Sequence, residues 1–280
     1  MKILLAVDKS RQAKEAARSV RDCFPGSEIE LLHVLDIEAA PHSHLSAALI
    51  DEEHRKIRTR LWADANRFLA KFVTLFARMS RKVRVLVGEG HASDVILQTA
   101  SASPPDLIVL GSRGLSELQA FVLGAVSYRV AHEAPCPVLL IKHALPPVPK
   151  ILLAVDGSPA AGRAVGFLAG SSLFASSHVV VLSVGTPSSE LQQYVSGVVS
   201  ELSSRGHTVD ARVLQGEPAA TILQRARDEG IDLIITGSRE VRDWLHPWLW
   251  SISRKIIMHA TISVLIVHGS APEAKEEDAE

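Results

Sequence analysis

The chain has 280 residues, of which 47% are hydrophobic and only 5% aromatic, so we expect a core of Val, Ile, Leu and Ala. Its 30 Lys and Arg residues balance 31 Asp and Glu residues. This balance argues against a broad nucleic-acid-binding surface, which needs a basic face. No apolar run approaches the length of a membrane span, and the run that ends at Asp8 is too short for a signal-peptide core. Cys23 and Cys136 are too few for a disulfide framework, so we expect two reduced thiols in a cytoplasmic protein.

The heptapeptide KILLAVD occurs at residues 2–8 and again at residues 150–156. The two heptapeptides are 148 residues apart, and further matching segments follow in the same order. Val87-Gly88-Glu89 matches Gln215-Gly216-Glu217 at a separation of 128 residues. Residues 106–112 match 232–238, and residues 138–141 match 264–267, both at a separation of 126 residues. The chain therefore contains two copies of one domain, and the second copy has about twenty residues fewer between its first and third strands. We predict domain 1 over residues 1–145, domain 2 over residues 149–270, and a disordered acidic tail over residues 271–280.

Short runs rich in Val, Ile and Leu alternate with segments of helical periodicity in both copies. The predicted strands of domain 1 are Ile3–Val7, Ile29–Leu35, Val83–Val87, Leu107–Leu110 and Val138–Ile141. Those of domain 2 are Ile151–Val155, Val179–Val184, Val209–Leu214, Leu233–Thr236 and Val264–Val267. Helical spacing runs from Ala13 to Val20 and from Ile50 to Phe76, where we expect Trp62 and the Phe residues to pack in the core. The alternation predicts an α/β fold with two doubly wound parallel-sheet domains in tandem.

A glycine-rich loop follows the fourth predicted strand of domain 1. It reads Gly111-Ser-Arg-Gly114, then nine residues, then Gly124-Ala-Val-Ser127 at the start of a helical pattern. Such glycines let the backbone approach a ligand, and free N–H groups at a helix start favour an anion such as phosphate. Arg113 could add charge, and Asp8, at the end of the first strand, could hold a ribose hydroxyl or a metal. The alternative is that these glycines only make turns. Because the P-loop and the dinucleotide fingerprint are both absent, this loop is the predicted nucleotide site.

The chain resembles the universal stress proteins, in their tandem two-domain form, over nearly its whole length. The resemblance rests on Ala6-Val-Asp8, Leu32-His33-Val34, Gly88-Glu89, the spacing of Gly111, Gly114 and Gly124, and Ala134-Pro-Cys-Pro-Val138. It implies adenine nucleotide alpha-hydrolase-like domains and an ATP site in domain 1, with or without Mg²⁺. By that resemblance, the residues that line the nucleotide are Ala6, Asp8, Val34, Leu110, Gly111, Gly114, Gly124, Val126 and Ser127. Val34 would meet the adenine, Asp8 the ribose side, and the glycine loop with Arg113 the phosphates.

Two positions of domain 1 depart from the family pattern. Ala125 stands where the family has Ser or Thr, which removes one phosphate-binding hydroxyl while Ser127 remains. Lys9 stands where the family has the Gly of its usual Asp-Gly-Ser.

Domain 2 departs from the pattern in the loop itself. Glu240 replaces the second glycine and puts a carboxylate where a triphosphate would lie, and Trp250 replaces the third glycine with a bulky indole. We therefore expect domain 2 to be closed to ATP. Its cluster of Trp244, Trp248 and Trp250 is expected to pack or to form an interface.

No other constellation in the sequence predicts chemistry. His42, His44, His54 and His91 lack a clear third metal ligand, so we expect solvated histidines and no metal site. Neither a nucleophile elbow nor a zinc-protease motif occurs.

The sequence thus predicts a stress-response regulatory protein, not an enzyme, that binds ATP in domain 1 and acts through protein partners that the sequence does not identify. We expect the last strands of the two domains to meet about a pseudo-twofold axis, which makes the chain an internal dimer and leaves a homodimer open. The alternatives are a weak ATPase or nucleotidyl-transfer enzyme, and a nucleotide-free interaction module.

Overall fold

The computed structural model describes residues 1–36, 47–77, 82–113, 123–170, 174, 176–238 and 252–268, with side chains described from residue 55 onward in the second of these segments. The elements of the first half are β1 (Lys2–Ala6), α1 (Arg11–Cys23), β2 (Glu28–Leu35), α2 (Ala47–Phe76), β3 (Lys82–Glu89), α3 (Ala92–Ala102), β4 (Leu107–Gly111), α4 (Ala125–Glu133) and β5 (Val138–Ile141). Those of the second half are β6 (Ile151–Ala154), α5 (Pro159–Gly170), β7 (His178–Val184), α6 (Ser189–Ser204), β8 (Thr208–Leu214), α7 (Pro218–Asp228), β9 (Leu233–Gly237), α8 (Ile252–His259) and β10 (Ser263–Val267).

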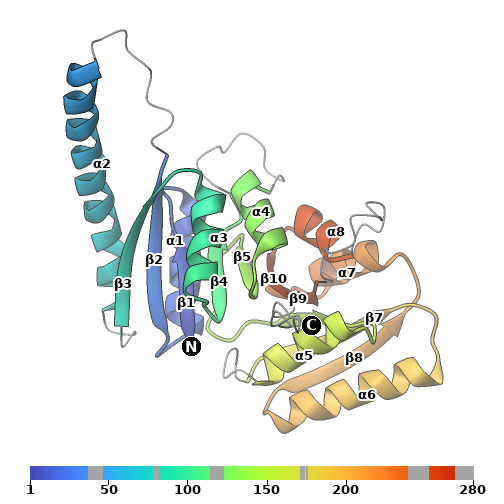
Figure 1. The fold of residues 1–280 in the computed structure, drawn as a ribbon. Helices are drawn as coiled ribbons and strands as arrows, with labels where there is room; N and C mark the ends of the chain where they lie inside the picture. Colours follow the sequence, from blue (N-terminus) through green and yellow to red (C-terminus); the bar gives the residue numbers. More distant parts are fainter. Residues whose placement is uncertain are drawn as a thin grey trace, which may run out of the picture.

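These strands form one sheet in the order β3-β2-β1-β4-β5-β10-β9-β6-β7-β8, with helices on both faces (Figure 1). Every neighbouring pair is parallel except β5 and β10, which run antiparallel. The alternation of strand and helix confirms the predicted fold class, and each predicted strand lies inside an observed strand or extends one residue past it. Over the described residues, no helix has both the length and the apolar character that crossing a bilayer requires.

The pairing registers correct one part of the predicted repeat. Ile29 of β2 pairs with Val83, and its equivalent Val179 pairs with Val209, so the third strands are separated by 126 residues. The glycine equivalent to Gly216 is therefore Gly90, and the predicted match to Gly88 is wrong. Both glycines adopt positive φ, 120° for Gly90 and 139° for Gly216, which glycine tolerates because it lacks a Cβ. The error arose because domain 1 has a Gly-Glu dipeptide at residues 88–89, two residues before the glycine that is structurally equivalent to Gly216.

The helix between the second and third strands accounts for most of the difference in length between the copies. It has 30 residues in α2 and 16 in α6. The C-terminal half of α2 packs on the sheet through Phe72 and Phe76, which are buried as predicted. Ile57 is 44% exposed, because α2 continues past the end of β3 (Figure 1). Trp62, predicted as a core residue, is only half-buried, and its indole N–H donates a hydrogen bond to the Glu89 carboxylate.

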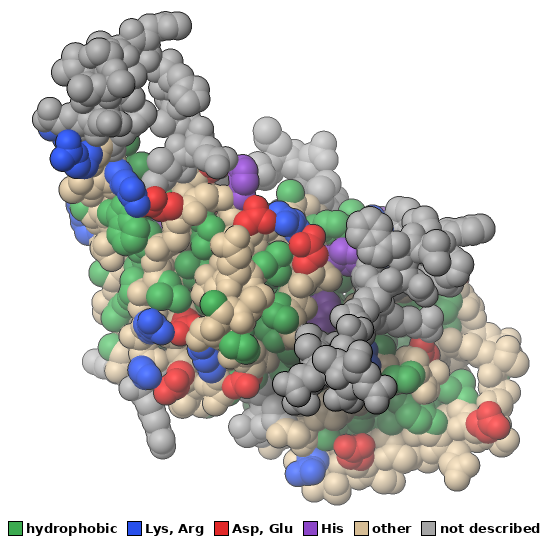
Figure 2. Space-filling model, viewed as in Figure 1, with side chains coloured by type: hydrophobic (Ala, Val, Ile, Leu, Met, Phe, Trp, Pro, Cys, Tyr) green, Lys and Arg blue, Asp and Glu red, His purple; other side chains and the backbone are tan. Residues whose placement is uncertain are grey.

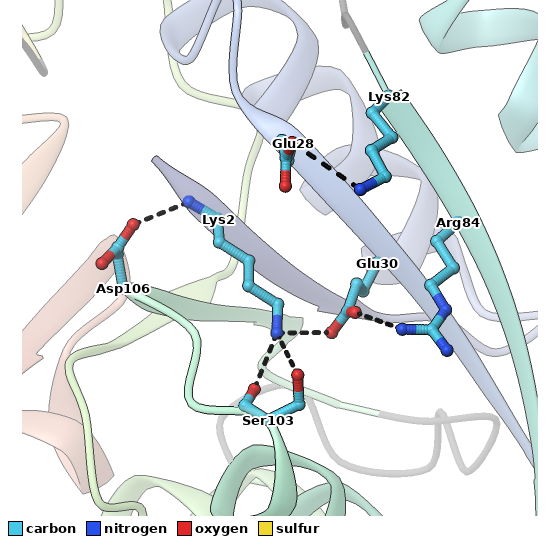
Figure 3. Close-up of polar contacts among 7 residues, drawn as sticks. All are labelled: Lys2, Glu28, Glu30, Lys82, Arg84, Ser103 and Asp106. Carbon is cyan, nitrogen blue, oxygen red and sulfur yellow. Dashed lines mark hydrogen bonds and ion pairs between the residues drawn. The ribbon is translucent and has the colours of Figure 1, made fainter.

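The lysine of each KILLAVD heptapeptide has a structural role at the amino ends of the strands. In Figure 3, the Lys2 amide donates to the Asp106 carboxylate at 2.7 Å, and its ammonium reaches Ser103 and the buried Glu30. Glu30 also pairs with Arg84 at 3.4 Å. In domain 2 the Lys150 amide donates to Asp232 at 2.8 Å and its ammonium to the Glu229 carbonyl at 2.8 Å. Because both copies repeat these contacts, fold stability explains why both keep the lysine.

The two cysteines behave as predicted. Cys23 and Cys136 are free and buried. Burial raises the pKa of each thiol to about 12, so both are protonated and unreactive at neutral pH.

The two halves join where β5 pairs with β10, which is the meeting of last strands that the sequence predicts. Lys142, directly after β5, donates its amide N–H to Ser263 Oγ at 3.2 Å and its ammonium to the Ala260 carbonyl. Burial, and then the charge of Arg113, lowers the pKa of Lys142 to about 8. Above the sheet, the Arg254 guanidinium lies 5.4 Å from the centre of the Tyr128 ring. Helices α4 and α8 therefore contact each other across the same junction.

A depressed lysine pKa predicts a particular pH dependence of stability. Between pH 8 and the ordinary lysine value of 10.5, the unfolded chain binds more protons at Lys142 than the folded chain does. The cost of burying this charge is therefore fully present below pH 8 and disappears as pH rises to 10.5. In urea titrations, the Lys142→Met variant should gain stability relative to the parent below pH 8, and this difference should shrink between pH 8 and 10.5. Lys14→Met, at an exposed position of α1, controls for the loss of a lysine, and a difference independent of pH would contradict the prediction.

A second prediction concerns the glycine that ends β9. A Cβ at Gly237 would lie 2.0 Å from the carbonyl oxygen of Ala160, so α5 could not keep its present distance from the sheet. We expect Gly237→Ala to lower the free energy of unfolding by about 1–3 kcal/mol through overpacking. Gly166→Ala is the matched control, because nothing lies within 4 Å of its added Cβ and alanine favours the helix. Equal effects of the two substitutions in chemical denaturation would refute the prediction.

Candidate functional site

The candidate site lies at the carboxyl ends of β1 and β4, where the strand order of domain 1 reverses. β1 is followed in the chain by β2 on one side, and β4 by β5 on the other. Ligands of open parallel sheets bind at such points. Ala6 and Leu110 are Cα partners in neighbouring strands, and Val34 lies two residues beyond the partner of Ala6 in β2. Ala6 and Val34 are half-buried, so this edge keeps apolar side chains partly open to a ligand.

Asp8 forms a local turn that both domains share. Its Oδ1 accepts a hydrogen bond from the Ser10 amide at 3.0 Å, and Ser10 Oγ caps α1 by accepting from the Ala13 amide at 3.1 Å. Domain 2 repeats the turn. Asp156 Oδ1 accepts a hydrogen bond from the Ser158 amide at 3.0 Å, and Ser158 Oγ accepts one from the Ala161 amide at 3.2 Å. The aspartate is therefore explained in part by the start of the first helix, and its Oδ2 takes no part in this turn.

Gly111 is required by packing within domain 1. A Cβ at this position would lie 2.7 Å from Gln12 Cβ and 2.9 Å from the Gln12 carbonyl carbon. Gly237 meets the same constraint from α5 in domain 2. The missing side chain thus admits the first turn of a helix, so the presence of this glycine in both copies does not by itself indicate a nucleotide site.

Ser127 is buried and its hydroxyl is already engaged. Ser127 Oγ donates to the Gly111 carbonyl at 2.7 Å, which ties the first turn of α4 to the end of β4. The Gly124 amide donates to the Ser112 carbonyl at 2.9 Å and reinforces the same connection. Ser127 therefore lies in the first turn of α4, at the predicted phosphate side of the site, but its hydroxyl proton is already used in a hydrogen bond to the backbone.

The amino terminus of α4 is the part of the site best suited to an anion. Gly124 is its N-cap residue, and no side chain caps the helix, in contrast to α1 and α6, which are capped by Ser10 and Ser188. The next residues, Ala125 and Val126, are exposed and half-buried respectively. Backbone N–H groups at an uncapped helix start favour negative charge.

Arg113 and Gly114 complete the predicted phosphate side. Arg113 is half-buried and lies close enough to Lys142 for its charge to lower the pKa of that amine. Gly114 falls outside the described residues, as do Glu240 and Trp250 of the domain 2 loop and the histidines at 42 and 44. Within the described ranges, no group of three or more His, Cys, Asp and Glu side chains could hold a metal ion.

His33 is a residue of this edge to which the sequence analysis assigned no role. It is only 8% exposed, and its Nδ1 lies 2.8 Å from the Val7 carbonyl oxygen. Its ring packs 5.0 Å from the ring of Phe68 on α2. It therefore links the end of β1, the end of β2 and the long helix. The Leu-His-Val pattern was the available signal, but a polar residue within an apolar strand has many explanations.

Comparison with known proteins follows the same division into halves. The Universal stress protein family matches residues 1–142 and again residues 147–268. The chain belongs to the universal stress protein family.

Three relatives illustrate the similarity of this family member to known proteins. Universal stress protein Slr1230 of Synechocystis sp. is 27% identical over 266 residues, which cover 86% of this chain and 89% of the relative. A universal stress protein of Thermus aquaticus is 35% identical over 140 residues, or 50% of this chain and 97% of the relative. The crystal structure of a universal stress protein from Archaeoglobus fulgidus shares the fold, with a TM-score of 0.69 and 22% identity over 95% of this chain and 98% of that one.

The hydrogen bond of Ser127 predicts a stability effect. Ser127→Ala should lower the free energy of unfolding by about 1 kcal/mol, because the Gly111 carbonyl loses its buried donor. Ser200→Ala is the control, since Ser200 is an exposed helical serine whose hydroxyl bonds only within α6. Chemical denaturation measures both, and an unchanged Ser127→Ala midpoint would show that the hydroxyl does not hold α4 to β4.

Proposed function

We propose that this universal stress protein is a regulatory protein that binds ATP, or a related adenine nucleotide, at the carboxyl edge of the domain 1 sheet. The occupied and empty states would present different surfaces to a protein partner. The observation that carries the proposal is the uncapped start of α4 beside the point where the strand order reverses.

The residues at this edge fit the parts of an adenine nucleotide. The half-buried Ala6 and Val34 offer an apolar surface for the base, and Leu110, the strand partner of Ala6, is buried beside them. Asp8 Oδ2 lies at the end of the adjoining strand for the ribose, or for a Mg²⁺ ion carried by the phosphates. The main-chain N–H groups of Ala125 and Val126, with Arg113, would hold the phosphates. Because Ser127 Oγ donates to Gly111, main-chain donors supply this anion site and Ser127 acts by positioning α4.

Domain 2 would not bind ATP under this proposal. The support comes from the sequence, in which Glu240 and Trp250 occupy the positions of Gly114 and Gly124. A carboxylate repels a triphosphate, and an indole blocks close approach of the main chain.

The main competing function is a protein-interaction module that binds no nucleotide, and the small number of side-chain donors at the site favours it. Ala125 supplies no hydroxyl and the hydroxyl of Ser127 is engaged, so the site has fewer side-chain donors than the family pattern implies. A weak ATPase is a further alternative with less support, since the described part of the site presents no base hydrogen-bonded to a nucleophile.

Calorimetric titration with ATP separates these functions. We expect one ATP per chain without turnover, and an affinity reduced at least ~10-fold in Gly114→Glu, which copies the domain 2 residue. Gly166→Glu introduces the same charge on an exposed position of α5 and should bind like the parent. Multiple turnover would establish an enzyme, and no binding by a folded parent would establish the nucleotide-free module.

A further inference from the structure

Lys142 lies between the start of α4 in domain 1 and the end of α8 in domain 2. It follows β5 directly, and hydrogen bonds connect this end of β5 to α4. The Ser112 amide donates to the Ile141 carbonyl at 2.8 Å, and the Ser112 carbonyl accepts from the Gly124 amide at 2.9 Å. In the other direction, the Lys142 ammonium donates to the carbonyl of Ala260, the residue directly after α8. A short series of contacts therefore joins the start of α4 to domain 2.

Lys142 also lies on the face of the sheet that carries α4. Leu140 belongs to the same cluster of buried residues as Leu110 and Ala260. Because side chains alternate between the faces of a sheet, residue 142 follows residue 140 on that face. The hydrogen bond to Ala260 agrees with this direction. The ammonium is therefore on the same side of the sheet as the helix start that the proposed site uses for phosphate.

The surroundings of Lys142 differ from those of most charged side chains of the molecule. On the face drawn in Figure 2, Lys and Arg side chains lie among Asp and Glu side chains at the surface, where water screens their charges. Lys142 is half-buried. Burial, and then the charge of Arg113, lowers its pKa to about 8. A smaller change in nearby charge therefore alters its protonation near physiological pH than would alter that of an exposed lysine.

Arg113 is the charged group that lowers the pKa of Lys142, and it lies at the proposed phosphate position. Gly111 and Ile141 are Cα partners in neighbouring strands, so Arg113 and Lys142 follow paired positions of β4 and β5. Titratable groups on the elements around Lys142 also include His143, next in the chain, Glu15 of α1, Arg129 and His132 of α4, and Lys255 and His259 of α8.

The corresponding contact of domain 2 carries no charge at neutral pH. His268 stands 126 residues after Lys142, follows β10 directly and lies against the Ala131 backbone of α4. Burial is the main cause that lowers the pKa of His268 to about 4, so its ring is neutral at pH 7. Each domain thus contacts the last helix of the other through the residue after its last strand, but Lys142 alone of the two changes its charge near pH 8.

We infer, on the basis of the proposed ATP site, that Lys142 transmits nucleotide occupancy of domain 1 to α8 of domain 2. Phosphates bound at the start of α4 favour the ammonium form of Lys142. The ammonium makes a stronger hydrogen bond to the Ala260 carbonyl than the neutral amine does, and a cation stabilises the carboxyl end of a helix. ATP binding in domain 1 therefore holds α8 more firmly.

Proton uptake on binding tests the first step. Calorimetric ATP titrations at pH 8, in buffers that differ in ionisation enthalpy, should show that the parent takes up ~0.2–0.5 proton per ATP more than Lys142→Met does, because a group with a pKa of about 8 is half protonated before binding. Proton exchange by ATP itself is common to all the proteins and cancels. Lys142→Arg, which stays charged, should also lack the extra uptake. Lys14→Met, at an exposed position of α1, should keep it.

Two results of these titrations would be distinct. Equal proton uptake by the parent and a Lys142 variant that both bind ATP would overturn the role of Lys142 and leave the proposed ATP site intact. Absence of ATP binding by the folded parent would overturn both.

Hydrogen exchange tests the second step at α8 itself. Saturating ATP should slow amide exchange over residues 252–259 at least ~3-fold in the parent at pH 8, and it should leave α6, which lies away from the junction, unchanged. Lys142→Met should lose the effect, and Lys142→Arg should show slow exchange of α8 without ATP. An equal response of α8 in the parent and in Lys142→Met would show that Lys142 does not carry the coupling.

Discussion

The antiparallel pairing of β5 with β10 is the contact on which the arrangement of the whole molecule depends. It converts two parallel sheets into one sheet of ten strands. Because the two halves run in opposite directions across this pair, the carboxyl ends of their strands lie at opposite edges of the sheet. The carboxyl ends of the strands in the two domains therefore face away from each other, and α4 and α8 meet above the junction.

Duplication within one chain separates structural residues from candidate functional ones. Lys2 and Lys150 make matching contacts at the amino ends of the strands, and Asp8 and Asp156 make matching turns. Gly111 and Gly237 both make room for the first turn of a helix. What both copies keep is thus largely explained by folding, so the proposed difference in function depends on the loops after β4 and β9.

The sequence by itself determined the duplication, the fold class, the strands and the family. Strands that are buried on both faces of a sheet must be apolar along their length, so they appear in the sequence as continuous apolar runs, and repeated motifs can be recognised without a structure. The sequence alone matched Gly216 with Gly88 instead of Gly90, because an alignment of the Gly-Glu dipeptides ignores which residues pair across neighbouring strands. Only the tertiary structure decided that Gly111 accommodates Gln12, that Ser127 is hydrogen-bonded to Gly111, and that His268 lies against the Ala131 backbone of α4. These contacts join residues far apart in the chain, and their distances follow from how helices settle on the sheet.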